Sequence, residues 1–171
     1  MTLEDEEFLK RYAFLVGSLV INFQSLEILL RLFLQAQPGA ESMGIPYGQD
    51  IYSAPVGSVV GLCPLTNLDS LDKLIEKYNR VAYAQGKPKI DPKLVEVRDA
   101  LAHGRNSATM EGIPMRSIKY SAPLHPEKKT VKVTFNAVLD EDWFKEQKAR
   151  VVAAMRTVHQ ASQKPHSPNP T

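Results

Sequence analysis

Residues 12–34 read YAFLVGSLVINFQSLEILLRLFL, a stretch almost long enough to cross a membrane. At 100° per residue its apolar side chains form two stripes, the first made of Leu19, Phe23, Leu26, Leu30 and Phe33 and the second of Ile21, Ile28 and Leu32. Glu27 and Arg31 interrupt the stretch, and an ionised group at the centre of a bilayer costs about 2.5–3.5 kcal/mol. We therefore expect a helix over residues 3–37 that is buried on two sides in a bundle or dimer, and no membrane span.

Three further helices are expected downstream. The Gly- and Pro-rich residues 38–65 show no sustained period and predict a long connection. A helix then starts at Thr66 or Asn67, either of which can cap it, and its apolar stripe continues to Val81. Asp91-Pro92 predicts the start of a helix that ends at His103, with Gly104 as a left-handed stop. Acidic residues 140–142 suit the positive end of a last helix.

Two short alternating runs, residues 116–120 and 130–135, predict a β-hairpin. Ile118 and Tyr120 would share one face with Val131, Val133 and Phe135, leaving Lys119 and Lys132 in water. The expected fold is therefore mainly α, an antiparallel up-and-down helical bundle of four main helices with a small β-hairpin before the last helix. We expect residues 1–163 to form a single domain and residues 164–171 to be a disordered C-terminal tail.

Composition is that of a soluble globular chain, with 43% hydrophobic and 23% charged residues. The formal charge of +2 is too small by itself to indicate a polyanion partner. Cys63 is the only cysteine, which excludes a disulfide framework and the usual cysteine-based metal sites. With an acidic start unlike a signal peptide, the chain is expected in the cytoplasm.

The segment VEVRDALAHGR, residues 95–105, carries the candidate chemistry. Arg98 presents a planar, permanently charged fork that suits phosphate oxygens. Asp99 and His103 are four residues apart on the predicted helix, so the carboxylate is expected to orient the imidazole and favour its protonated form. These are the groups needed to cleave a phosphodiester without a metal, His103 moving protons and Arg98 offsetting negative charge.

One helix supplies only part of such a site. A five-residue offset places the Arg98 and His103 side chains about 140° apart on an ideal helix. Two copies meeting at a two-fold axis would bring a second arginine and histidine into one cleft and so provide both an acid and a base. We therefore expect a homodimer.

Residues 98–103, Arg-Asp-Ala-Leu-Ala-His, resemble the signature of the HEPN (higher eukaryotes and prokaryotes nucleotide-binding) family, an arginine and a polar residue followed by a histidine. The resemblance extends to the helical layout over residues 3–162. It implies a helical bundle that dimerises along the signature helices and, in many members, a metal-independent RNase of toxin–antitoxin or phage-defence systems, with an antitoxin protein as partner. Carried over, Arg98 and His103 would be catalytic with Asp99 in support. Gly104, Arg105 and Asn106 follow the histidine where some members carry a modified tyrosine, which puts that form of regulation in doubt.

Substrate contacts are expected from the basic residues Arg105, Lys119 and Lys132. They belong to a basic run with Arg116, Lys128 and Lys129 that would track an RNA backbone. The alternative for this run is a solvated strand edge. Asn22 and Glu27 are candidates for a secondary shell around the cleft, and Glu27 is alternatively a simple helix pair with Arg31. No cofactor or metal is expected. The competing function is a noncatalytic HEPN-like module that binds a protein or nucleotide partner, in which Arg98 forms an ordinary ion pair and His103 caps its helix.

Overall fold

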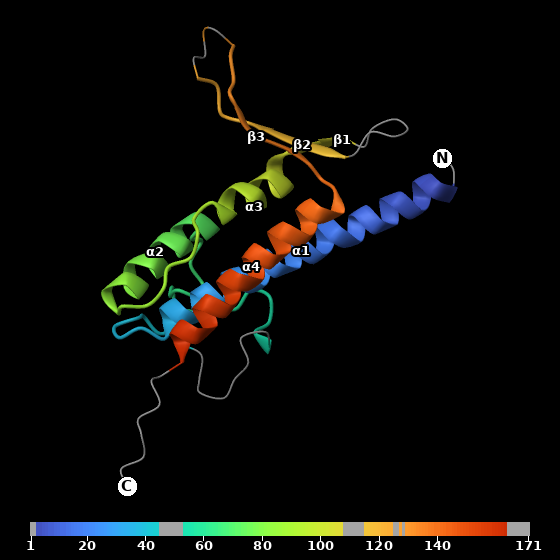
Figure 1. The fold of residues 1–171 in the computed structure, drawn as a ribbon. Coiled ribbons are helices and arrows are strands. Elements are labelled where there is room, and N and C mark those ends of the chain that lie inside the picture. The colour runs from blue at the N-terminus through green and yellow to red at the C-terminus, as the bar shows by residue number, and fades with distance from the viewer. Residues whose placement is uncertain (1–2, 45–52, 108–114, 125–126, 128, 164–171) are drawn as a thin grey trace. The chain divides into compact units, whose positions relative to one another are not determined.

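The computed structural model describes residues 3–44, 53–107, 115–124, 127 and 129–163. The fold is mainly helical, as predicted, with a small antiparallel sheet (Figure 1). Its elements are α1 (Leu3–Gln35), α2 (Leu71–Ala84), α3 (Leu94–His103), β1 (Arg105–Ser107), β2 (Arg116–Tyr120), β3 (Val133–Val138) and α4 (Glu141–Ser162). The predicted tail, residues 164–171, lies outside the described residues.

The chain divides into two compact units. The first comprises the described parts of Met1–Gln24 and Lys93–Ala153, and the second those of Ser25–Pro92 and Ala154–Thr171. The first unit therefore holds α3 and the sheet, and the second holds α2, while α1 and α4 each contribute residues to both.

Helix α1 buries one of its two apolar stripes and exposes the other. Leu19, Leu26 and Leu30 are fully buried, as predicted for the first stripe. The second stripe is exposed instead of buried, with Ile21 at 62% of its possible surface and Ile28 and Leu32 also open. Among the described residues, Glu6–Gln35 is long and apolar enough to cross a membrane, and 22% of its most apolar window is buried. The prediction of burial on two sides does not hold for the single chain.

The second unit is organised around Arg31, which is buried on α1. Its guanidinium donates to the carbonyl oxygens of Pro64, Asn67 and Asp69 at 2.8–3.0 Å and pairs with Glu27, the predicted helix pair. Asn67 also accepts from Arg31 through its side chain. Because the end of the long connection wraps around this cation, helix α2 starts at Leu71 and the predicted start at Thr66 or Asn67 is wrong.

The core of the second unit contains an aromatic pair. Phe33 of α1 and Tyr78 of α2 meet edge to face with ring centroids 4.9 Å apart. Tyr78 is fully buried, and its hydroxyl donates to the carbonyl of Pro88 at 3.0 Å, so the polar end of the ring is satisfied. The stripe of α2 predicted from its period is thus the face that packs against α1.

In the first unit, β2 lies between β1 and β3 in an antiparallel sheet (Figure 1). The predicted hairpin is therefore extended by a strand that the sequence did not suggest, since β1 has three residues and starts directly after α3. The second predicted strand is shifted to Val133–Val138, and a register shift opposite Lys119 and Tyr120 changes which of its residues face the same way.

The faces of β2 are the reverse of those predicted. Ser117 is buried and Lys119 is only partly exposed, whereas Arg116 and Tyr120 are exposed. The side of the sheet that meets α3 therefore carries Ser117 and Lys119, and Lys119 does not extend into water as predicted. Phe135, opposite Lys119, packs against Trp143 of α4 with ring centroids 6.4 Å apart.

Gly104 joins α3 to β1 in an extended conformation, φ −70° and ψ 157°, and is not the left-handed stop that was predicted. A glycine is required for a different reason. A Cβ atom at this position would lie 2.2 Å from the carbonyl oxygen of Ala100 and 2.7 Å from the hydroxyl of Ser117. The absence of a side chain lets the end of α3 lie close against β2.

Candidate functional site

Asp99 is the centre of the candidate site. Its Oδ1 accepts from Nη1 of Arg98 and its Oδ2 accepts from Nζ of Lys119, both at 3.1 Å. Arg98 and Asp99 are consecutive on α3, and Lys119 reaches them from β2. The carboxylate therefore ties the end of α3 to the sheet and fixes the position of Arg98.

The electrostatics of Asp99 follow from these contacts. Burial alone would raise the pKa of Asp99, but the hydrogen bonds and positive charges of Lys119 and Arg98 outweigh it and hold the pKa below its usual value. The group is thus a carboxylate at neutral pH. Two cations share one anion, so the cluster keeps a net positive charge that suits a phosphate.

Arg98 is restrained but accessible. Its side chain retains 38% of its possible exposure, and a single carboxylate oxygen accepts from it among the described residues. The guanidinium has five N–H donors in a fork, so most of them are left for another acceptor.

His103 is exposed at the last position of α3. The hydrogen bonds of Asp99 go to Arg98 and Lys119, not to His103 as the four-residue spacing predicted. The structure therefore brings Arg98, Asp99 and Lys119 together and leaves the imidazole of His103 directed into solvent beyond them. Among the residues described in the single chain, none orients this ring through the predicted carboxylate bond.

The remaining predicted site residues have other contacts. Arg105 is exposed on β1, with its guanidinium carbon 5.3 Å from the ring centroid of Tyr120. Lys132 is exposed just before β3, and its backbone N–H donates to the hydroxyl of Ser121 at 3.0 Å. Asn22 donates to the carbonyl of Ser18 within α1, and Glu27 belongs to the second unit, where it pairs with Arg31.

Tyr120 is a residue that the sequence pattern did not mark as a functional candidate. Its aromatic side chain alone was no signal, because an aromatic residue at such a position in a strand usually belongs to a core. What makes it notable is the neighbouring Arg105, and that neighbour depends on the short strand β1. Trp143, in contrast, is half-buried and packs edge to face on the buried Phe144 with centroids 5.0 Å apart.

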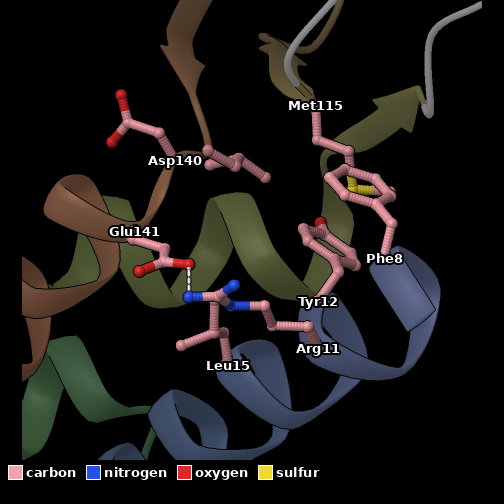
Figure 2. Close-up of a pocket in the computed structure, with 8 residues that line it drawn as sticks. Phe8, Arg11, Tyr12, Leu15, Met115, Asp140 and Glu141 are labelled. Carbon is pink, nitrogen blue, oxygen red and sulfur yellow. Dashed lines mark ion pairs between the residues drawn. The ribbon is translucent and has the colours of Figure 1, made fainter. Parts of the chain in front are cut away.

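A separate pocket of about 240 Å³ lies elsewhere in the first unit (Figure 2). Apolar side chains including Phe8, Leu15 and Met115 line it, and Arg11 and Glu141 form an ion pair at its edge. Tyr12 also lines it, with a shielded hydroxyl that finds no partner in the described part of the chain. Burial raises the pKa of Tyr12, so it stays a neutral phenol at physiological pH.

The described residues contain no group of three or more His, Cys, Asp or Glu side chains placed to hold a metal ion. In comparisons with known proteins, no family model matches this chain, no curated protein matches its sequence and no solved structure matches its fold.

Proposed function

We propose that this protein is a metal-independent RNA endonuclease of the HEPN type that acts as a homodimer. One observation carries the proposal. On α3, Arg98 is held by Asp99 with its guanidinium still accessible, and His103 lies exposed at the end of the same helix. A fixed, available phosphate ligand and a solvent-facing imidazole on one short helix suit phosphodiester cleavage.

The proposed reaction is attack of a ribose 2′-oxygen on the adjacent phosphorus. One His103 accepts the proton of the 2′-hydroxyl as the new P–O bond forms, and a second His103 donates a proton to the 5′-oxygen as the old P–O bond breaks. The products are a 2′,3′-cyclic phosphate and a 5′-hydroxyl. Arg98 donates to the non-bridging oxygens, where negative charge grows. Asp99 acts through Arg98 and is a positioning residue.

A second copy of the chain supplies the second imidazole. The exposed stripe of α1 supports pairing, because Ile21, Ile28 and Leu32 form an apolar surface that the single chain leaves open. Ser18 and Ser25 lie beside it and would allow a close helix approach. Within each copy, the proposed arrangement of the four helices is an antiparallel up-and-down bundle.

A toxin or phage-defence role and an antitoxin protein as a further partner follow from the resemblance of residues 98–103 alone, and a cytoplasmic location follows from the single cysteine and the acidic N-terminal residues. They are included in the proposal on that basis. A noncatalytic module is the second candidate, and the bonding of Asp99 favours it. Its two oxygens accept from Arg98 and Lys119, and among the described residues it makes no hydrogen bond that would orient His103.

Cleavage of single-stranded RNA in EDTA separates the two functions. The wild type is expected to release fragments ending in a 2′,3′-cyclic phosphate, identified by mass spectrometry, and His103→Ala to be slower by about 10²–10⁴-fold. His159→Ala is the matched control, because His159 is an exposed histidine on α4 that bonds only Gln163 among the described residues. Equal cleavage rates for the wild type and His103→Ala would contradict the nuclease proposal and favour the noncatalytic module.

A further inference from the structure

The three-stranded sheet has an outer face that no proposed step uses. Alternation along β2 places Arg116, Ile118 and Tyr120 on one side and Ser117 and Lys119 on the other. The second set contacts α3 through Asp99, so the first set forms the outer face. Register adds Arg105, directly opposite Ile118, and Val133, directly opposite Tyr120.

Charge and aromatic surface meet on this outer face. Arg105 lies between Arg116 and Tyr120 along the strand direction, because its partner Ile118 is two residues from each. Its guanidinium is 5.3 Å from the centroid of the Tyr120 ring, and Tyr120 keeps 36% of its possible exposure. The planar cation therefore lies over the aromatic ring, and the two form one combined surface on this face.

The two arginines of the outer face differ from Arg11 and Arg98 of the same unit. The latter two each pair with a carboxylate, whereas Arg105 and Arg116 have no carboxylate partner among the described residues, and both are exposed. The strands β1, β2 and β3 themselves contain no Asp or Glu. Among the described residues, positive charge is thus left without a carboxylate partner over about 13 Å of strand, the length from Arg116 to Tyr120 at about 3.3–3.4 Å per residue.

We propose that the outer face of the sheet binds single-stranded RNA, with bases stacking on Tyr120 and the Arg105 guanidinium and phosphates contacting Arg105 and Arg116. Unpaired bases stack on aromatic rings and on guanidinium planes, and a single strand needs cations along its backbone. Arg105 follows His103 by two residues, so a strand on this face leads directly to the end of α3. The proposal rests on RNA being the substrate of the proposed nuclease.

This surface differs from the basic track expected from sequence. Lys119 is not part of the proposed surface, because it lies on the opposite face of the sheet and donates to Asp99. Arg116 stays in the track and Tyr120 is added to it, since the register of β1 places Arg105 beside both.

The test is binding of a fluorescein-labelled single-stranded RNA of mixed sequence, followed by anisotropy in EDTA with His103→Ala as the background. Tyr120→Ala is expected to weaken binding by at least about fivefold, the lower end of what stacking contributes per base. Tyr120→Phe keeps the ring and is expected to bind like the background protein. Arg105→Gln with Arg116→Gln is expected to reduce the slope of log K against log salt by about 1.4, because each phosphate that is no longer neutralised lowers the slope by about 0.7.

Arg80→Gln is the control, since it removes the same charge from an exposed position on α2. Circular dichroism of each variant verifies the fold, and the double arginine variant tests the surface without altering the aromatic ring. Unchanged affinity in both Tyr120→Ala and the double variant overturns the proposal, as does equal weakening by Arg80→Gln.

Cleavage is measured separately in the chain with His103 intact. If Tyr120→Ala and the double variant cleave RNA at the rate of the wild type, the proposed RNA surface is wrong and the proposed nuclease function stands. If RNA binding depends on Tyr120 but the protein does not cleave RNA, the proposed RNA surface is supported and the proposed nuclease function is wrong.

Discussion

Arg31 and Arg98 both lie on helices and both pair with a carboxylate, yet their surroundings differ. The side chain of Arg31 retains 9% of its possible exposure, and its donors reach Glu27, three backbone carbonyls and a side-chain amide. Arg98 retains 38% and reaches one carboxylate oxygen. A fully satisfied guanidinium holds a fold together, whereas a partly satisfied one is available to a ligand. Sequence spacing alone does not distinguish them.

Removal of Arg31 is expected to have the largest effect, and it tests whether this arginine holds the fold together. Arg31→Ala is expected to lower the free energy of unfolding by about 3–5 kcal/mol, as for one partner of a buried ion pair. Glu27 and the carbonyls of Pro64, Asn67 and Asp69 would be left without their donor. Urea denaturation measures the change. Arg80→Ala is the control, because its exposed pair with Glu76 has the same four-residue spacing and is expected to contribute about 1 kcal/mol or less.

Removing Arg98 is expected to affect cleavage instead of stability. Arg98→Ala should slow RNA cleavage by about 10²–10³-fold, the range for removal of one donor to a developing oxyanion. The free energy of unfolding should change by about 1 kcal/mol or less, since the pair with Asp99 is partly exposed. Arg98→Lys keeps the charge but not the fork and is expected to recover only part of the rate. A drop in stability as large as that of Arg31→Ala, with cleavage unaffected, would make Arg98 a structural residue.

Gly104 fixes the end of α3, the helix on which Arg98 and His103 lie. Gly104→Ala is expected to destabilise the protein by about 1–3 kcal/mol, since its Cβ would overlap the Ala100 carbonyl oxygen. Gly17→Ala is the matched control. A Cβ at Gly17 meets nothing within 4 Å, and alanine in a helix is expected to stabilise it by up to about 1 kcal/mol. Thermal unfolding of the two variants measures the change in stability, and so tests whether Gly104 lies as close to Ala100 and Ser117 as the structure shows.

The helices were predictable because their apolar residues repeat at the helical period. The stripe of Leu19, Leu26 and Leu30 and that of α2 from Leu71 to Tyr78 are local patterns, and the structure buries both. Leu68, with which the predicted stripe of the second helix begins, precedes α2 and is exposed. The start of α2 was not predictable in this way. Thr66 and Asn67 are good capping residues, but Asn67 is used by Arg31 from 36 residues away, a contact that no local window contains.

The candidate site was predicted in its residue types more than in its contacts. Arg98 and Asp99 were found from the composition of one helix, and the sheet then supplied Lys119 as the partner of Asp99 in place of His103. Lys119 was predicted to face solvent because the two faces of β2 were assigned the wrong way round. Alternation divides the residues of a strand into two faces, but it does not tell which face packs against α3. The short strand β1 gave no periodic signal at all.

The smallest expected effect is the pH dependence that Asp99 gives to stability. Because its pKa in the folded protein is lowered by Lys119 and Arg98, the contribution of Asp99 is complete above its ordinary pKa and is lost as pH falls through the lowered value. Asp99→Asn removes this dependence, so wild type and variant should differ by about 1 kcal/mol or less at pH 7 and converge in acid. Urea unfolding of both proteins from neutral pH into the acid range measures the difference.

Glu146→Gln is the control for removal of one carboxylate. Glu146 is exposed beyond the first turn of α4 and forms no ion pair with the described residues, so this variant is expected to show no such convergence with the wild type. A difference between Asp99→Asn and wild type that stays constant into acid would mean that the two cations do not hold Asp99 as an anion. The position of Arg98 would then depend on something other than this carboxylate, and the contrast with Arg31 would have to rest on exposure alone.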